Sequence, residues 1–187
     1  MSAPIIVPEA DRLMIARLYA KMDYTVGAEI GTAAGDYAHS ICRLNPGVKL
    51  YCIDAYTSYS GYDDYNAGQM EKNYEKAVEI LKPYDVEFIR SYSSTAVGLF
   101  DDGALDFVYI DANHEWPYIA QDLYCWDKKV RSGGIISGHD YEIVPRSDGK
   151  CHVKSALLGY TDAFNIDEWF VYGTGDGRVG SWYWVKQ

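Results

Sequence analysis

Short apolar runs alternate along this chain with longer stretches in which apolar residues recur every three or four positions. Five short runs have the length of buried strands, and they span residues 26–30, 49–54, 86–90, 105–110 and 133–138. Four longer stretches have a helical period, and they span residues 35–44, 67–81, 93–100 and 117–130. Strands that alternate with helices favour a parallel sheet with right-handed crossovers and helices on both faces. The pattern therefore predicts an α/β fold of the Rossmann-like, doubly wound type.

The two ends of the chain depart from this alternation. Residues 8–22 predict an N-terminal helix with Pro8 in its first turn. Beyond the fifth strand the sequence is irregular, and it then favours a helix over 151–164. Two more strands, at 168–173 and 181–186, are close enough to form a hairpin.

Nothing in the sequence divides the chain into separate domains. It has no internal repeat, no low-complexity segment and no linker, so we expect one domain over residues 1–187. Within it we distinguish an N-terminal helical part (1–24), a central part (25–138) and a C-terminal part (139–187). The glycine-rich loop 173–178 is the expected turn of the C-terminal hairpin.

The composition narrows the kinds of partner. The chain has 187 residues, 48% of them hydrophobic, and a formal net charge of -10 at pH 7. An acidic protein repels phosphate backbones, so we expect no nucleic-acid partner. No apolar stretch is long enough to cross a membrane and the N-terminus has no secretory pattern, so we expect a cytoplasmic protein without a membrane partner. The four cysteines include no C-x-x-C pair, which favours free thiols.

The segment VGAEIGTAAGDY begins at the first strand and contains a glycine-rich turn. Gly31 and Gly35 allow a tight turn and a close approach of the backbone to a ligand at the carboxyl edge of the sheet. The spacing is not the G-x-G-x-x-G of dinucleotide sites, and Glu29 ahead of the turn suits a ligand that carries positive charge. The amino group and sulfonium centre of S-adenosylmethionine meet that requirement. The alternative is a turn that merely connects a strand to a helix.

Two further strand ends carry polar side chains. Asp54 ends the second strand, about 20 positions after the turn, where an acidic residue can accept hydrogen bonds from ribose hydroxyls. Ser91, Tyr92 and Ser93 follow the third strand and offer hydrogen bonds or a stacking face to an adenine ring. Asp54 alone is also compatible with a helix cap. The three features together, in this order, predict a cofactor site.

Four segments, AEIGTAAGDY, YCIDAY, DFVYIDANHE and GGIISGHDY, resemble the successive motifs of class I S-adenosylmethionine-dependent methyltransferases. The chain is most similar to small O-methyltransferases related to enzymes of macrolide-sugar and cephalosporin pathways, and more distantly to catechol O-methyltransferase. The resemblance covers about residues 24–187. It implies a seven-stranded sheet in the order 3-2-1-4-5-7-6 with the last strand antiparallel.

The resemblance also implies which parts of the chain bind cofactor and acceptor. S-adenosylmethionine is expected in the central part, and the methyl acceptor beside the C-terminal part. The residues expected to bind the cofactor are Glu29, Gly31, Thr32, Gly35, Asp54, Ala55, Ser91, Tyr92, Ser93, Asp111 and Trp116.

By the same resemblance, catalysis is expected where the fourth and fifth strands end. Asp111 corresponds to a metal-binding aspartate, His114 to the general base, and His139 and Asp140 to two further metal ligands. A divalent cation lowers the pKa of a hydroxyl group, and histidine can remove its proton near neutral pH. Magnesium prefers oxygen ligands, so an imidazole at position 139 suits manganese, iron, nickel or zinc better. The alternative is no metal, with His139 and His114 performing the acid–base chemistry directly.

Several of these residues also have structural interpretations. Asp140 could cap a loop, and His139 could be a hydrogen-bonded histidine at the sheet edge. Trp116 precedes Pro117, which suits the start of a helix as well as it suits a cofactor contact. His152 follows the irregular segment and is a further candidate near the acceptor.

The acceptor side of the sequence indicates a small hydroxylated molecule such as a sugar, polyol or phenol. Two loops, 55–69 and 140–152, could cover it, and no separate acceptor domain precedes the first strand, so a second copy of the chain could complete the site. Two other functions compete with O-methyl transfer. One is a non-catalytic module that binds S-adenosylmethionine. The other is a dinucleotide or nucleotide-sugar enzyme, against which the missing G-x-G-x-x-G and Glu29 argue.

Overall fold

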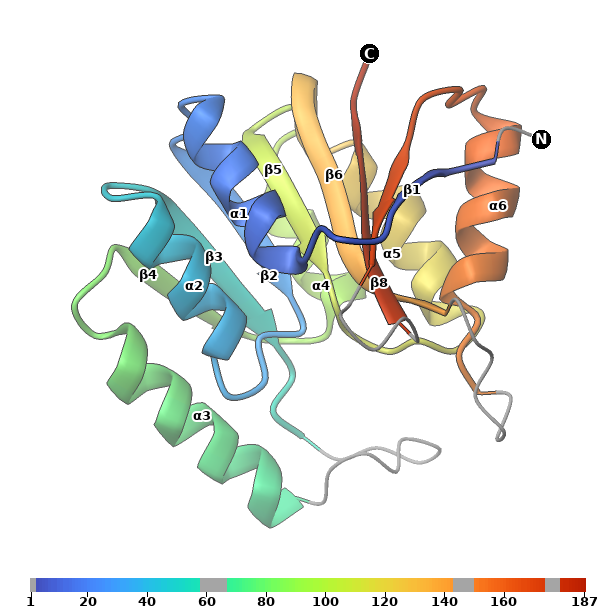
Figure 1. Cartoon of the computed structure of the whole chain (residues 1–187). Coiled ribbons are helices and arrows are strands. Elements are labelled where there is room, and N and C mark those ends of the chain that lie inside the picture. Colours follow the sequence, from blue (N-terminus) through green and yellow to red (C-terminus); the bar gives the residue numbers. More distant parts are fainter. Residues whose placement is uncertain (1–2, 58–66, 143–149, 174–178) are drawn as a thin grey trace.

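The computed structural model describes residues 3–57, 67–142, 150–173 and 179–187. They form one eight-stranded sheet with helices on both faces (Figure 1). The strands are β1 (Ile5–Val7), β2 (Val26–Ile30), β3 (Lys49–Asp54), β4 (Val86–Arg90), β5 (Leu105–Ile110), β6 (Val130–Glu142), β7 (Phe170–Tyr172) and β8 (Val179–Val185). The helices are α1 (Arg12–Lys21), α2 (Asp36–Leu44), α3 (Ala67–Leu81), α4 (Ser93–Ala96), the 3-10 turn η1 (Val97–Leu99), α5 (Tyr118–Asp127) and α6 (Val153–Ala163).

The order of the strands is β1-β7-β8-β6-β5-β2-β3-β4. Without β1, the other seven strands follow the expected order 3-2-1-4-5-7-6, and β8 is antiparallel to both β6 and β7. The doubly wound α/β class is therefore confirmed. The sheet differs from the expectation by one strand, because β1 extends it by pairing parallel to β7.

Several boundaries differ from the sequence prediction by one to three residues, and three differences are larger. The first helix begins after Asp11, whose side chain accepts a hydrogen bond from the backbone N of Met14, and not at Pro8. The segment before it forms β1, a three-residue edge strand too short and too exposed to give a periodic signal. The fifth predicted strand, β6, continues past residue 138, so His139 and Asp140 lie inside a strand whose register with β8 shifts between Gly138 and Tyr141.

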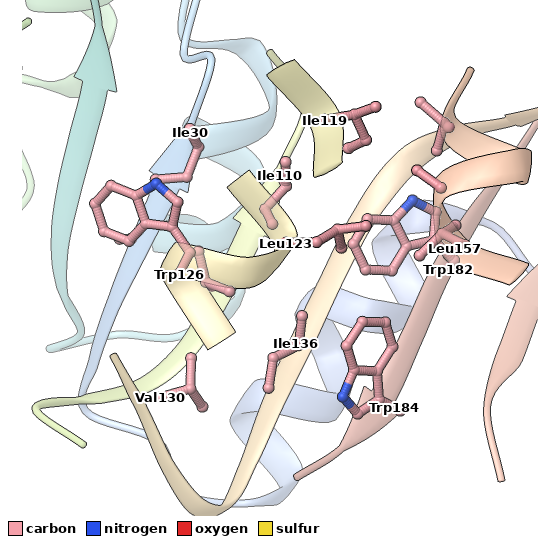
Figure 2. Close-up of a cluster of buried hydrophobic side chains, with 14 of the residues drawn as sticks. Ile30, Ile110, Ile119, Leu123, Trp126, Val130, Ile136, Leu157, Trp182 and Trp184 are labelled. Atoms are coloured by element: carbon pink, nitrogen blue, oxygen red, sulfur yellow. The ribbon is translucent and has the colours of Figure 1, made fainter. Parts of the chain in front are cut away.

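One face of the sheet is covered by α4, α5 and α6. The apolar stripe predicted on α5 points at the sheet, and Leu123 and Trp126 are fully buried there. Figure 2 shows Trp126 and Leu123 lying over Ile110 and Ile136, with Trp182 and Trp184 of β8 beside them. These large side chains fix α5 against the strands whose ends carry the predicted site.

The other face is covered by α1, α2 and α3. Tyr19 of α1 stacks on Phe107 of β5 with ring centroids 3.9 Å apart, and its hydroxyl bonds Ser137 of β6 at 2.6 Å. A Cβ at Gly27 would lie 2.2 Å from the Phe107 ring, so only glycine fits under this stack. Among the helices of the described residues, none has the length and apolar composition needed to span a bilayer.

Candidate active site

A cavity of about 850 Å³ lies at the carboxyl edge of the parallel strands. Its wall comes from the segments that follow β2, β3, β4 and β5, together with residues of α1, α3 and α5. Parallel strands bring their carboxyl ends to one edge, which is where ligands bind in open α/β sheets. Most of the predicted site residues line this cavity: Glu29, Gly31, Thr32, Asp54, Ala55, Ser91, Tyr92, Ser93, Asp111 and His114.

Gly31 determines how closely two strand ends approach. Its φ is +91°, and a Cβ at this position would lie 2.1 Å from the carbonyl oxygen of Asp111. Its backbone N donates to the carbonyl of Ile53 at 2.8 Å. Gly35, at φ +79°, is the residue before α2 and is not among the residues that line the cavity. A Cβ there would lie 3.1 Å from Ala77 of α3, so the close approach of α3 also favours glycine.

Asp54 joins the turn after β2 to the end of β3. Its carboxylate accepts hydrogen bonds from the backbone N of Ala33 at 2.9 Å and of Tyr56 at 2.8 Å. Burial raises the pKa of Asp54, and these two hydrogen bonds partly offset the effect. The carboxylate is therefore held in a fixed orientation at the cavity wall.

Glu29 is a buried carboxylate with an unused oxygen. The residue is 2% exposed, and its Oε2 has no hydrogen-bond partner among the described residues, nor has the Oγ1 of Thr32. Burial raises the pKa of Glu29 well above its usual range, and the nearby charge of Asp111 raises it further. The neighbouring Thr32 hydroxyl lowers it in part, although its contact with the carboxylate does not have good hydrogen-bond geometry. A buried carboxylate is costly unless it is paired, so a cation placed in the cavity would compensate it.

The four residues predicted for catalysis meet where the segment that follows β5 passes beside His139 and Asp140 of β6. His114 Nε2 lies 2.8 Å from Asp140 Oδ2 and 3.6 Å from Asp111 Oδ1. His139 Nδ1 lies 3.3 Å from Asp140 Oδ2. The ligand atoms of Asp111, His139 and Asp140 all lie within 4.8 Å of one another, so the fold assembles the predicted metal-binding trio.

The charged groups of this cluster change one another's pKa values. Burial lowers the pKa of His114, but its contacts with Asp111 and Asp140 outweigh burial and raise the pKa to about 10. His114 Nε2 is at ion-pair distance from both carboxylates, although neither contact has good hydrogen-bond geometry. Burial raises the pKa of Asp140, but His114 and His139 hold it well below its usual range. Its contacts with the two carboxylates therefore favour the protonated form of His114.

Trp116 lies away from the cavity. Its side chain is 60% exposed, and it is not part of the cavity wall. Its backbone N donates to Nδ1 of His152 at 3.0 Å, and the backbone N of His152 donates to the carbonyl of His114 at 2.8 Å. Pro117 is the residue before α5. The cofactor contact predicted for Trp116 therefore stays a prediction, and these two backbone hydrogen bonds join His152 to the loop that carries His114.

The structure adds residues that the sequence analysis did not select. Arg12 at the start of α1 lines the cavity, and its guanidinium lies 5.1 Å from the ring centroid of Tyr37. Asp122 of α5 is 4% exposed, lines the cavity, and accepts a hydrogen bond from Ser93 Oγ. Burial raises the pKa of Asp122 to about 6, although the bond from Ser93 lowers it. The sequence could have pointed to Asp122, because it places a carboxylate on the otherwise apolar stripe of a predicted helix.

The two loops predicted to cover the acceptor are described only in part. Residues 58–66 and 143–149 lie outside the described residues, as do residues 174–178 of the predicted hairpin turn. Of the first loop, Tyr56 and Thr57 line the cavity.

The chain matches the family described as a methyltransferase domain over residues 28–141, which is more than half of its length. The match begins in β2 and ends in β6, so it includes every strand end that forms the cavity. Among curated proteins, none matches the chain.

Solved structures with the same fold include several O-methyltransferases. One from an O-methyltransferase family protein of Burkholderia thailandensis has a TM-score of 0.66 at 13% identity and covers 94% of this chain and 55% of that one. TomG of Streptomyces achromogenes is an O-methyltransferase of tomaymycin synthesis and was solved with S-adenosylmethionine. It has a TM-score of 0.65 at 18% identity, and the match covers 94% of this chain and 80% of TomG. An O-methyltransferase of Bacillus cereus, solved with S-adenosylhomocysteine, has a TM-score of 0.66 at 16% identity, and the match covers 93% of this chain and 80% of the Bacillus protein.

The solved structures and the family match support different conclusions. At such low identities the solved structures show the fold, and this chain spans little more than half of the Burkholderia protein. The family match is independent of them and covers the strand ends that build the cavity. The chain therefore belongs to the methyltransferase-domain family.

Proposed function

We propose that this protein is an S-adenosylmethionine-dependent O-methyltransferase that acts on a small hydroxylated molecule. The observation that carries the proposal is Glu29, a buried carboxylate with an unpaired oxygen at a cavity of about 850 Å³ in a methyltransferase-domain chain. This volume is typical of a small-molecule site. Two of the solved structures with this fold contain S-adenosylmethionine or its product.

The polar groups of the cavity match the polar groups of that cofactor. Glu29 would pair with the α-ammonium group, and Asp54 would accept from the ribose hydroxyls. Arg12 is the only lysine or arginine among the described residues of the wall, and it would bind the α-carboxylate. Ser91 and Ser93 lie beyond Asp54 and would face the base. This orientation directs the methylsulfonium group toward Asp111 and His114.

The trio of Asp111, His139 and Asp140 fits a divalent metal ion. Two carboxylates and one imidazole within 4.8 Å form a mixed oxygen and nitrogen donor set, which suits manganese, iron, nickel or zinc better than magnesium. A bound ion would lower the pKa of an acceptor hydroxyl and fix its position.

We assign His114 the role of general base. It lines the cavity beside Asp111, where an acceptor hydroxyl would approach the methyl group. The contacts with Asp111 and Asp140 that raise the pKa of His114 oppose this role as long as both carboxylates keep their full negative charge. Neutralising those carboxylates would remove the contacts that raise the pKa of His114. Asp111, His114 and His139 are thus the proposed catalytic residues.

Calorimetry with S-adenosylhomocysteine tests the cofactor part of the proposal. We expect saturable binding to the wild type and at least about tenfold weaker binding to Asp54→Ala, because the ribose hydroxyls lose a charged acceptor. Asp85→Ala, which changes an exposed carboxylate paired with Lys49, is the matched control and should bind like the wild type. No binding at millimolar ligand would refute the proposal.

Turnover separates the enzyme from a binding module that does not catalyse. Methyl transfer to a panel of sugars, polyols and phenols should be detected, and His114→Ala should reduce kcat by roughly 100-fold or more if His114 is the base. Cofactor binding without turnover on any acceptor would favour the non-catalytic module. The specific observation in its favour is the position of His114 Nε2 beside the carboxylates of Asp111 and Asp140, which favours protonated His114.

A further inference from the structure

Asp122 is a carboxylate in an unusual place. It lies on the face of α5 that packs against the sheet, where its neighbours Ile119, Leu123 and Trp126 are buried. It is 4% exposed and is one of the residues that line the cavity. An apolar residue at this position would continue the stripe of the helix.

The burial of Asp122 is not compensated within the described part of the chain. Its hydrogen bond is the one from Ser93 Oγ, and that bond engages a single carboxylate oxygen, Oδ1. No salt bridge involving Asp122 is found among the described residues. A buried carboxylate with so few partners destabilises a protein. The free oxygen, Oδ2, therefore has the properties of a ligand contact: it accepts hydrogen bonds and lies at a cavity.

The position of Asp122 along the cavity selects the part of the ligand that it meets. Asp54 ends β3, and Ser93 follows β4, the next strand toward the edge of the sheet. Asp122 is joined to Ser93 by a hydrogen bond, so it contributes to the cavity wall beside the segment that follows β4. If the ribose binds at Asp54 and the methyl group at Asp111, the base lies at Ser93 and Asp122.

We propose that Asp122, oriented by Ser93, recognises the exocyclic amino group of the adenine base. This inference rests on the proposed S-adenosylmethionine site. The amino group donates hydrogen bonds, and an ionised carboxylate only accepts them. Hypoxanthine has a carbonyl oxygen at the same place, which the carboxylate repels. Asp122 thus selects adenine over bases that carry an oxygen there.

The test compares S-adenosylhomocysteine with S-inosylhomocysteine, in which a carbonyl oxygen replaces the 6-amino group and the neighbouring ring nitrogen N1 carries a proton. By calorimetry at pH 7.5, the wild type should bind the adenine compound at least about 30-fold more tightly, because the carbonyl leaves the carboxylate unpaired. In Asp122→Asn, Ser93 can still donate to the amide oxygen, so the amide nitrogen faces the base. The dissociation constants of this variant for the two compounds should lie within about threefold of each other. Compared with the wild type, it should bind S-adenosylhomocysteine more weakly and S-inosylhomocysteine more tightly.

Two controls separate this inference from the proposed function and from a folding defect. Asp127 lies on the same helix, but its carboxylate pairs with Lys186 and does not line the cavity. Asp127→Asn should therefore keep the wild-type ratio of the dissociation constants for the two compounds. Ser93→Ala keeps the charge of Asp122 but frees its orientation, and it should reduce the ratio without abolishing it. A wild-type ratio below about threefold, or an unchanged ratio in Asp122→Asn, would overturn the inference while S-adenosylhomocysteine still binds. Failure of the wild type to bind S-adenosylhomocysteine would instead refute the proposed function.

Discussion

The burial of Asp122 predicts a conflict between stability and binding. Burial raises the pKa of Asp122 to about 6, above its value in the unfolded chain, so the charged form is less favourable in the folded protein. This cost is present above pH 6 and disappears as the pH falls toward 4. Asp122→Asn should therefore increase the free energy of unfolding at pH 7.5 by on the order of 1–3 kcal/mol, and have little effect near pH 4.

Urea unfolding of the ligand-free protein at the two pH values measures this difference. A purely structural aspartate would show the opposite result, a loss of stability at pH 7.5 in the asparagine variant. Gain of stability with loss of adenine selectivity is the pattern expected of a residue retained for binding.

Glu29 predicts proton release when the cofactor binds. Burial and the charge of Asp111 raise its pKa well above the usual range, and an ammonium group beside it would favour the ionised form. Binding should therefore become tighter as the pH rises, and should release a proton. Calorimetry of S-adenosylhomocysteine in buffers of different ionisation enthalpy measures the release, and Glu29→Gln should remove that contribution. Equal buffer dependence in wild type and variant would contradict this role.

At the residue scale, sequence could identify the side chains that follow strands but not those that reach the cavity from elsewhere. Glu29, Asp54 and Asp111 stand at strand ends, and parallel strands bring such residues to one edge. Arg12 and Asp122 lie on helices, and only packing decides which side of a helix faces the cavity. Trp116 shows the reverse case, since this aromatic residue beside the motif is exposed and is not part of the cavity wall.

At the scale of elements, Gly138 fixes the distance between β6 and its neighbours. A Cβ there would lie 2.3 Å from the carbonyl oxygen of Ile110 and 2.4 Å from the ring of Trp182. Gly138→Ala should therefore destabilise the protein by about 2 kcal/mol or more, and shift His139 and Asp140 out of place.

Gly159 provides the matched control for this substitution. It lies on the exposed side of α6, and a Cβ there meets nothing within 4 Å. Gly159→Ala should stabilise the helix by about 0.5–1 kcal/mol. Thermal and urea unfolding of the two variants measure the contrast, and equal effects would show that Gly138 is not under steric constraint.

The accuracy of the sequence prediction differs between elements. The predicted bounds of β2, β3, β4 and β5 coincide with those of the structure, because these strands are continuous apolar runs closed by turn residues. β6 was predicted too short, because backbone pairing with β8 extends it through the polar residues His139 and Asp140. β1 was missed, because only pairing with β7 makes three exposed residues a strand.

At the scale of the whole molecule, the proposed metal site exists only in the folded chain. Asp111 ends β5, while His139 and Asp140 lie within β6, and the sheet brings them within 4.8 Å. A ligand that binds the folded state alone stabilises it. Manganese or zinc should therefore raise the melting temperature of the wild type more than magnesium does, since the trio includes an imidazole.

Exchange of one ligand should reverse this preference. His139→Asp makes the trio all-oxygen, so we expect magnesium to stabilise the variant more than the wild type, and zinc to stabilise it less. His39→Ala removes a histidine of α2 whose ring contacts Tyr84, and it should leave the response to every ion unchanged. If no ion shifts the melting temperature of the wild type, and methyl transfer survives exhaustive chelation, the trio is not a metal site. The acid–base chemistry would then belong to His114 and His139 alone, with Asp111 and Asp140 as the carboxylates that set their charge.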